Sequence, residues 1–320
     1  MKAVSPQLAD VITASRTTAV LFDRSVEGRL RALERDRLDL LQRMSTQDLT
    51  GMAAGAARRT VLTTAIGRMV DVLTVLNRGD TVLCLTGPGR AQAVRRWLAG
   101  YTFYNDKVKF EEASGGLAQF GVYGPRAGAA LDTVANGAQA LEPQQFVERD
   151  GVLVLRGHPF GKPGYTVIVP VERAGETRAA LIGAGVVPGD ETAYQALRLA
   201  LGEPEAGHEI TEEYIPLEAN LWNAVSFSKG CYIGQEIIAR MESRGKLARR
   251  LVGLRLSGPV ENGAEVRRGA ALVGSVTSAG DVPGLGPVAL AYLKTSAAQP
   301  GARVSVGQAE GEVAELPFIN

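Results

Sequence analysis

The stretch from Lys229 to Glu236, Lys-Gly-Cys-Tyr-Ile-Gly-Gln-Glu, constrains this chain more than any other segment. Apolar residues recur at helical spacing over 237–241, and Gly245 supplies a stop signal. The two glycines inside the stretch interrupt regular structure before that point. The pattern therefore predicts a loop that leads into a helix, with Cys231 about one turn before the helix N-terminus.

Two interpretations of Cys231 follow from this position. The positive partial charge at a helix N-terminus and the ammonium group of Lys229 would both favour a thiolate over a thiol. The helix end alone contributes about 0.3 to 1 kcal/mol, so activation would need Lys229 or a bound partner as well. The alternative is a small apolar cysteine buried in the core. The flanking Lys-Gly and Gly-Gln-Glu sequences favour the functional interpretation.

The composition predicts a globular protein with almost no net charge. The 320 residues include 35 Lys and Arg against 34 Asp and Glu, so we expect no direct binding of nucleic acid through overall charge. The sequence contains no run of about 18 apolar residues, and residues 1–23 lack the apolar core of a signal peptide. We therefore expect a cytoplasmic protein that does not associate with membranes. The length suggests two or three domains.

The spacing of cysteine and histidine predicts neither a disulfide framework nor a closed metal site. Cys84 lies in a strand pattern far from Cys231, and we expect it to be packed in the core. His158 and His208 are separated from each other and from both cysteines. We therefore assign no metal ligands.

The first two-thirds of the chain alternate between helical and strand-like periods. Residues 33–44 predict a solvated amphipathic helix, and residues 45–49 predict a shorter helical turn. Glycines at 157, 161 and 164 match neither GxGxxG nor GxxxxGK, so we interpret them as a hairpin turn rather than a phosphate-binding loop. The other predicted strands are 59–64, 69–76, 81–86, 107–110, 119–123, 152–155 and 165–169, and the other predicted helices are 90–99, 127–131 and 191–201.

After residue 246 the pattern changes to short strands separated by Gly and Pro, which predicts a small, closed or nearly closed β module. The predicted domains are therefore an α+β region over 1–246 and a C-terminal β-barrel over 247–320. Basic residues collect at the junction, and they suit a solvated surface and a local anion site equally well. These residues are Arg240, Arg244, Lys246, Arg249 and Arg250.

The Lys229–Glu236 stretch and the order of elements resemble the YgfZ-type folate-binding proteins, relatives of the glycine-cleavage T-protein, an aminomethyltransferase. This resemblance implies an α+β, T-protein-like fold, with two subdomains around a central folate pocket and a C-terminal β-barrel. It also implies tetrahydrofolate-linked assembly or repair of iron-sulfur clusters, with effects on cluster-dependent tRNA modification. The implied partners are reduced folate and iron-sulfur proteins or cluster-assembly factors. Supporting matches are 58–63, 67–71, 212–218, 274–278 and 316–318.

The resemblance makes Cys231 and Lys229 candidate catalytic residues. A single cysteine cannot hold a cluster, so Cys231 would donate one thiolate ligand transiently or form a mixed disulfide or adduct with a partner. Glycines beside it would let the backbone approach a ligand, while the Gln-Glu pair would fix the helix cap or contact that ligand. The candidate folate-binding residues are Gly230, Tyr232, Gly234, Gln235, Glu236 and Arg240.

Two departures from the T-protein pattern concern carboxylates. T-proteins carry Asn and then a catalytic Asp after the third strand of the meander, whereas residues 86–92 of this chain contain no carboxylate. Both families usually carry Arg-x-Glu-x-Gly, whose Glu pairs with the pterin edge. Here Ala200 occupies that position and cannot accept the pterin N–H groups, which weakens the expected folate binding. Glu203 and Glu205 are alternative acceptors.

These departures leave two other functions open. One is a folate-dependent aminomethyl or one-carbon transferase that takes its carboxylate from Asp71, Asp80 or Glu236. The other is a scaffold that has lost folate binding.

Overall fold

The computed structural model describes residues 7–157, 164–245 and 247–319. The chain forms two compact units, each assembled from separate segments. The first comprises Met1–Leu62, Asp71–Ala193 and Ser228–Tyr232, and the second comprises Thr63–Val70, Tyr194–Phe227 and Ile233–Asn320. The domain boundary expected at residue 246 stays a prediction, and Lys246, His158 and Gly161 lie outside the described residues.

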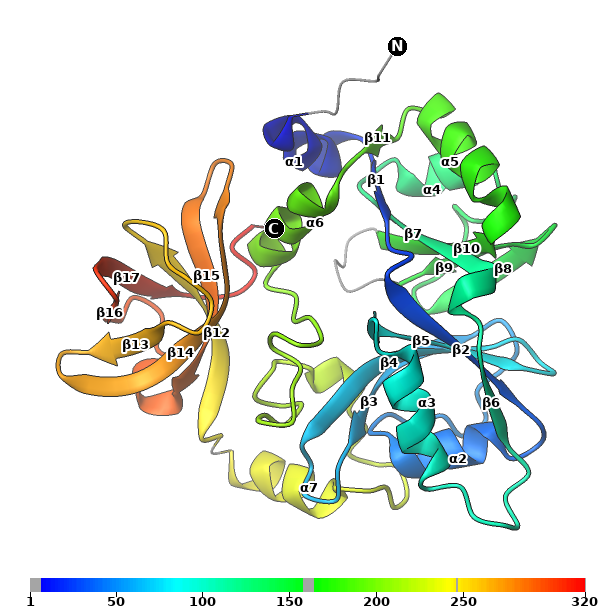
Figure 1. The fold of residues 1–320 in the computed structure, drawn as a ribbon, viewed down its shortest axis with the longest axis horizontal. Coiled ribbons are helices and arrows are strands. Elements are labelled where there is room, and N and C mark those ends of the chain that lie inside the picture. Colours follow the sequence, from blue (N-terminus) through cyan, green and yellow to red (C-terminus); the bar gives the residue numbers. More distant parts are fainter. Residues whose placement is uncertain (1–6, 158–163, 246, 320) are drawn as a thin grey trace. The chain divides into compact units, whose positions relative to one another are not determined.

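A five-stranded antiparallel sheet begins the first unit (Figure 1). Its central strands are mostly buried, and α3 contacts β2, β5 and β6. In spatial order the strands are β3 (Ala57–Thr63), β4 (Met69–Asn77), β5 (Val82–Pro88), β2 (Glu27–Leu33) and β6 (Lys109–Glu112); the helices that follow β2 and β5 are α2 (Arg37–Met44) and α3 (Ala91–Ala99).

A six-stranded sheet completes the first unit, and its strands are antiparallel except for the β1–β11 pair. Leu153, Leu155 and Ile168 pack with Leu76 and Leu83 of the five-stranded sheet. The strands in order are β11 (Val187–Pro188), β1 (Val20–Asp23), β7 (Leu117–Tyr123), β10 (Gly164–Pro170), β9 (Val152–Arg156) and β8 (Gln145–Arg149); the accompanying helices are α1 (Leu8–Thr17), α4 (Ala127–Leu131) and α5 (Ala174–Gly183).

A closed six-stranded barrel forms most of the second unit, shown in yellow to red in Figure 1. Small and β-branched residues such as Val276, Ala291 and Val304 fill it. The T-protein-like fold with its C-terminal barrel is therefore confirmed. The strands in order are β12 (Arg249–Leu256), β15 (Gly286–Lys294), β14 (Ala271–Val282), β13 (Glu265–Arg268), β16 (Arg303–Val306) and β17 (Ala309–Ala314); the helices of this part of the chain are α6 (Glu191–Leu201) and α7 (Gln235–Arg244).

A buried ion pair links α6 to the barrel inside the second unit. The Arg198 guanidinium donates to the Glu209 carboxylate at 2.9 Å and to the Ser278 hydroxyl at 2.8 Å. The Glu209 carboxylate also accepts from the hydroxyls of Thr277 and Ser278, at 2.6 and 2.7 Å. The Tyr292 hydroxyl donates to the Glu209 backbone carbonyl at 2.9 Å. Both charges are thus surrounded by hydrogen-bond partners, which is what a buried ion pair requires.

Two local predictions in the first unit are wrong. The helix expected over 33–44 begins only at Arg37, because residues 27–33 form a strand that pairs with strands on both sides. The helical turn expected over 45–49 is absent from this described segment. Ser45 instead forms a β-bridge with Leu62, and Thr46 N–H donates to Val61. Tertiary pairing therefore overrides local helical spacing at both places.

Candidate functional site

Lys229 is held by backbone carbonyl groups at the end of α2. Its Nζ donates to the carbonyl oxygens of Gln42, Ser45 and Gln47, at 2.7, 2.8 and 2.8 Å. An ammonium group has three N–H donors, so all of them are used. Burial lowers the pKa of Lys229 to about 8, and the Asp48 carboxylate opposes this shift. The cation also complements the negative end of the α2 dipole. The contacts therefore anchor the start of the Lys229–Glu236 stretch.

Replacing Lys229 with Met is expected to lower the free energy of unfolding by about 2–4 kcal/mol, because half-buried carbonyl groups lose a charged donor. Chemical denaturation in urea measures this loss. Lys107→Met is the matched control, since Lys107 is exposed and should change stability by less than about 0.5 kcal/mol. Unchanged stability of the Lys229→Met variant would show that the three carbonyl contacts contribute little.

Cys231 is exposed, whereas Cys84 is fully buried in the core. The buried-core interpretation of Cys231 is therefore wrong, and the packed position expected for Cys84 is confirmed. Lys229 anchors the chain three residues before Tyr232, and the centroid of the Tyr232 ring lies 5.0 Å from Lys229 Nζ. Burial raises the pKa of Tyr232 to about 12. The thiol thus follows a restrained segment and reaches solvent.

The second half of the stretch packs against the turn between β3 and β4, within the second unit. Thr63 Oγ1 donates to the Ile233 carbonyl oxygen at 2.8 Å. Gly234 precedes the first residue of α7 with φ +83°, a left-handed conformation that favours glycine. A Cβ atom there would lie 2.5 Å from the Thr64 carbonyl oxygen and 2.9 Å from the Gly67 Cα. The two glycines therefore permit a close approach of two backbone segments.

The predicted loop-to-helix transition is confirmed, since α7 runs from Gln235 to Arg244 and Gly245 ends it with φ +60°. Gln235 is half-buried in the first turn of α7, whereas Glu236 and Arg240 are exposed on that helix. Gly230 is exposed next to Cys231. Lys229, Gly230, Cys231 and Tyr232 belong to the first unit, and Gly234, Gln235, Glu236 and Arg240 belong to the second. Their roles as catalytic or folate-binding residues stay predictions.

Residue 200, the position that usually carries the pterin-binding Glu, is an alanine buried in the interior of this chain. Ala200 is fully buried, and its carbonyl oxygen accepts from the Phe318 N–H at 2.9 Å. The helix ends at Leu201, so Glu203 and Glu205 lie beyond it. Glu205 accepts from the Gln195 amide at 3.0 Å and lies 3.8 Å from the Arg198 guanidinium. Residue 200 therefore supplies no carboxylate, and the Glu205 carboxylate has partners within its own unit.

Asp71 is a buried carboxylate that lies beside residues 86–92, the segment that contains no carboxylate of its own. Its oxygens accept from the Val72 and Gly87 N–H groups, at 2.8 and 3.3 Å, and one lies 3.8 Å from the Arg90 guanidinium. Burial raises its pKa to about 6, and the charge of Glu27 adds to this shift, whereas Arg90 opposes it. Of the three carboxylates considered as alternatives, Asp71 therefore has the altered ionisation expected of a functional group.

Glu27 and Arg90 are the neighbours of Asp71 that the sequence did not reveal. Glu27 accepts from the buried Arg24 guanidinium at 3.0 Å, and it also accepts from the Gln119 amide. Glu27 is thus a second carboxylate whose charge raises the pKa of Asp71, although burial of Asp71 is the larger cause. The separation of these two residues by 44 positions in the sequence conceals this interaction.

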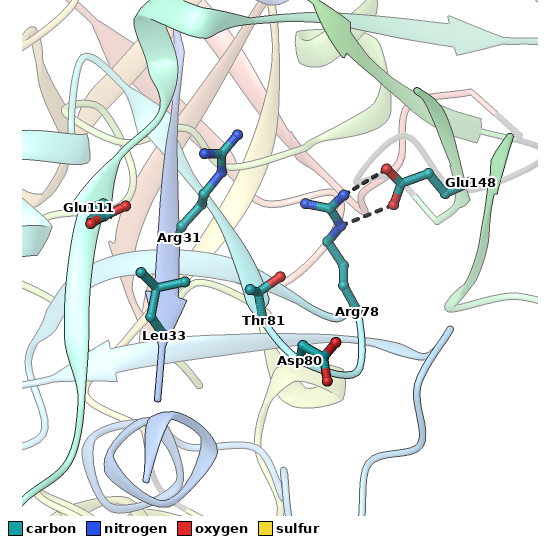
Figure 2. Close-up of a pocket in the computed structure, with 7 residues that line it drawn as sticks. All are labelled: Arg31, Leu33, Arg78, Asp80, Thr81, Glu111 and Glu148. Carbon is teal, nitrogen blue, oxygen red and sulfur yellow. Dashed lines mark hydrogen bonds and ion pairs between the residues drawn. The ribbon is translucent and has the colours of Figure 1, made fainter. Parts of the chain in front are cut away.

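Asp80 lines a cavity of about 430 Å³ in the first unit (Figure 2). On one side of this cavity Arg78 and Glu148 form a bidentate ion pair at 2.6 and 3.0 Å. Asp80 is exposed on the turn between β4 and β5. Figure 2 shows its carboxylate away from this ion pair. The cavity is therefore an open polar recess, and Asp80 lacks the burial that distinguishes Asp71.

The described residues contain no cluster of three His, Cys, Asp or Glu side chains placed to hold a metal ion. None of the helices that they form combines the length and apolar character needed to cross a membrane.

Known proteins resemble the chain along nearly its whole length. The GCVT N-terminal domain family matches residues 2–229, and the glycine cleavage T-protein C-terminal barrel domain family matches residues 249–319. A protein of Arabidopsis thaliana, provisionally named a chloroplastic transferase, is 30% identical, covering 97% of this chain and 73% of that protein. An aminomethyltransferase of Symbiobacterium thermophilum is also 30% identical, covering 95% of this chain and 87% of the enzyme.

Structural similarity agrees with these matches. The solved structure of the glycine cleavage system aminomethyltransferase T from Bartonella henselae has a TM-score of 0.87 to this chain. The two share 23% sequence identity, with 98% of this chain and 89% of that chain covered, so this likeness concerns the fold alone. From the family matches together with the shared fold, we conclude that the chain belongs to the glycine cleavage T-protein family.

Proposed function

We propose that this protein is a YgfZ-type member of the family that supports the assembly or repair of iron-sulfur clusters, and hence cluster-dependent tRNA modification. One observation carries the proposal: Cys231 is exposed two residues after Lys229, whose ammonium group three carbonyl groups hold in place. A cysteine with a packing role would be buried, as Cys84 is. An exposed thiol on a restrained loop suits transient ligation of iron.

The neighbours of Cys231 have distinct roles in this proposal. Cys231 donates one thiolate ligand to an iron atom, and its proton passes to solvent. Lys229 is a positioning residue rather than a direct partner of the thiolate, because carbonyl groups use its three N–H donors. Gly234 permits the close approach to the β3–β4 turn that sets the start of α7. The partners are iron-sulfur proteins or cluster-assembly factors.

Family membership implies reduced folate as the ligand, and the residues of this chain match that ligand only in part. A carboxylate can accept two adjacent N–H groups of a pterin, whereas buried Ala200 offers no such acceptor. We therefore derive no chemical step from folate. Gly230, Tyr232, Gln235, Glu236 and Arg240 are proposed as contacts for a tetrahydrofolate derivative that binds more weakly than in relatives with the usual Glu.

Two measurements on the wild-type protein test this proposal. In a strain that lacks the protein, its expression should restore the activity of a cluster-dependent tRNA-modifying enzyme. Calorimetric titration with tetrahydrofolate and its one-carbon derivatives should show weak binding. Restored activity without any heat of folate binding would leave a folate-independent scaffold. Failure to restore the enzyme would refute the iron-sulfur role.

Asp71 favours a second candidate, a folate-dependent aminomethyl or one-carbon transferase. Such transfer requires a base or an electrostatic stabiliser beside the reacting amine. Asp71 supplies a carboxylate next to Gly87 and Arg90, where the family's usual Asp is missing. Relatives of similar length are named aminomethyltransferases, which supports the same reaction class. Formation of methylenetetrahydrofolate from an aminomethyl donor (X–CH2–NH2), with release of ammonia and X–H, would favour this candidate over cluster maintenance.

If the transferase activity exists, Asp71→Asn is expected to abolish it, and wild-type turnover should rise with pH through about 6, because the base must be ionised. Asp80→Asn is the matched control and should retain turnover. A pH–rate profile of methylenetetrahydrofolate formation measures both effects. Full activity of Asp71→Asn would exclude Asp71 as the base.

The raised pKa of Asp71 also predicts how stability depends on pH. The folded protein binds the proton more tightly than the unfolded chain, so this contribution favours folding below about pH 4 and is lost as the pH rises to about 6. A rise from 3.8 to about 6 corresponds to about 3 kcal/mol. Urea denaturation at several pH values should therefore show Asp71→Asn gaining up to about 3 kcal/mol relative to wild type across this range.

A further inference from the structure

The loop between α3 and β6 can be followed in Figure 1. It carries two aromatic residues adjacent in the sequence whose side chains are exposed. Tyr104 is 99% exposed and Phe103 is 63% exposed. Earlier in the same segment, the rings of Trp97 and Tyr101 contact each other, with centroids 4.7 Å apart. Large aromatic groups that face solvent are costly unless another surface covers them.

The loop that carries these aromatic groups is held rigidly. The Asp106 carboxylate accepts from the Phe103 N–H at 2.8 Å and from the Arg43 guanidinium at 2.9 Å. The Lys107 N–H donates to the Asp36 carboxylate at 2.8 Å, and the Asp36 N–H donates to the Lys107 carbonyl oxygen at 3.0 Å. A preorganised loop loses little conformational entropy when a partner binds, so exposed rings on it make effective anchors.

The segment that carries the aromatic pair is rich in basic residues. Residues 90–109 contain five Lys and Arg but only one carboxylate, although the whole chain is nearly neutral. Asp106 pairs with Arg43, and Lys109 pairs with Glu111. Within the described part of the chain, Arg95, Arg96 and Lys107 form no ion pair. The segment that carries the aromatic anchors therefore has an excess of basic side chains.

We propose that residues 100–108 and the adjoining face of α3 form a docking surface for an acidic protein partner, anchored by Phe103 and Tyr104. Charge complementarity favours an acidic partner over a second copy, because a two-fold contact through this surface would oppose like charges. Three unpaired cations are fewer than the phosphate contacts that support strong nucleic-acid binding, about 6–10. The proposal goes beyond the role assigned to Cys231 and does not depend on it.

Site-specific photocrosslinking in cells tests the proposal. Benzoylphenylalanine at position 104 should form a discrete adduct with an acidic protein, whereas the same group at exposed position 272 of the barrel should not. Combining position 104 with Arg95→Glu and Arg96→Glu should reduce the yield by about ten-fold or more. Arg126→Glu with Arg178→Glu, at two other exposed arginines, changes net charge equally and should leave the yield unchanged.

Several results would overturn the docking surface. These are the absence of a discrete adduct, an adduct to RNA, an adduct to a second copy of the chain, and an adduct that persists after the charge reversal at positions 95 and 96. The same cross-link is scored in the Cys231→Ser background. If the adduct still forms in the Cys231→Ser variant while enzyme activity is not restored, docking does not depend on the proposed thiol chemistry.

Discussion

Cys231→Ser is expected to reduce the support of cluster-dependent enzyme activity to the level of a strain that lacks the protein. A serine hydroxyl remains protonated at neutral pH and is a poor ligand for iron, so the proposed ligation step is lost. Because the Cys231 side chain is exposed, the free energy of unfolding should change by less than about 0.5 kcal/mol. Complementation assays and thermal denaturation of the same variant measure the two effects.

Cys84→Ser supplies the matched control, since it makes the same chemical change at a fully buried site. It should destabilise the protein by about 1–3 kcal/mol, because it buries a hydroxyl group in an apolar core. Once folded, it should retain the activity that depends on Cys231. Normal complementation by Cys231→Ser would exclude thiol chemistry. If Cys231→Ser unfolds the protein instead, the Cys231 side chain has a structural role.

Glu209→Gln is expected to destabilise the second unit by about 3–5 kcal/mol. Glu209 is 0% exposed and Arg198 is 3% exposed, so the substitution removes the carboxylate 2.9 Å from this buried cation and leaves the more distant Glu205 carboxylate, at 3.8 Å, as its counter-charge. The glutamine amide also places N–H groups near the hydroxyls of Thr277 and Ser278, which donate to the carboxylate in the wild type. Chemical denaturation followed by circular dichroism measures the loss.

Two further variants define the origin of this effect. Glu265→Gln breaks the ion pair between Glu265 and Arg267, whose side chains are about half exposed, and should cost less than about 1 kcal/mol. The double replacement Arg198→Met with Glu209→Leu should recover part of the loss, because neither charge then remains buried. A small effect of Glu209→Gln, similar to that of Glu265→Gln, would mean that water reaches the Arg198 guanidinium.

Local sequence patterns predicted the helices and strands whose buried side chains recur at a regular spacing along the chain. The helices at 91–99, 127–131 and 191–201 follow their periodicity, and β9 and β10 pair as antiparallel neighbours. The barrel strands follow the Gly and Pro spacing, although β13 and β17 were not anticipated. The helix predicted from residue 33 began late because pairing on both sides of β2 outweighs helical spacing.

The sequence by itself determined the family motif, the transition from loop to helix after Cys231 and the missing carboxylates at 86–92 and 200, because these depend on residue type and local spacing. Only the tertiary structure decided what Lys229 and Asp71 contact. Lys229 donates to backbone carbonyl groups of residues that precede it in the sequence by 182 to 187 positions. The Asp71 carboxylate accepts from the Gly87 N–H of the neighbouring strand. A hydrogen bond forms over about 3 Å of space, whatever the separation along the chain, so folding alone could assign these partners.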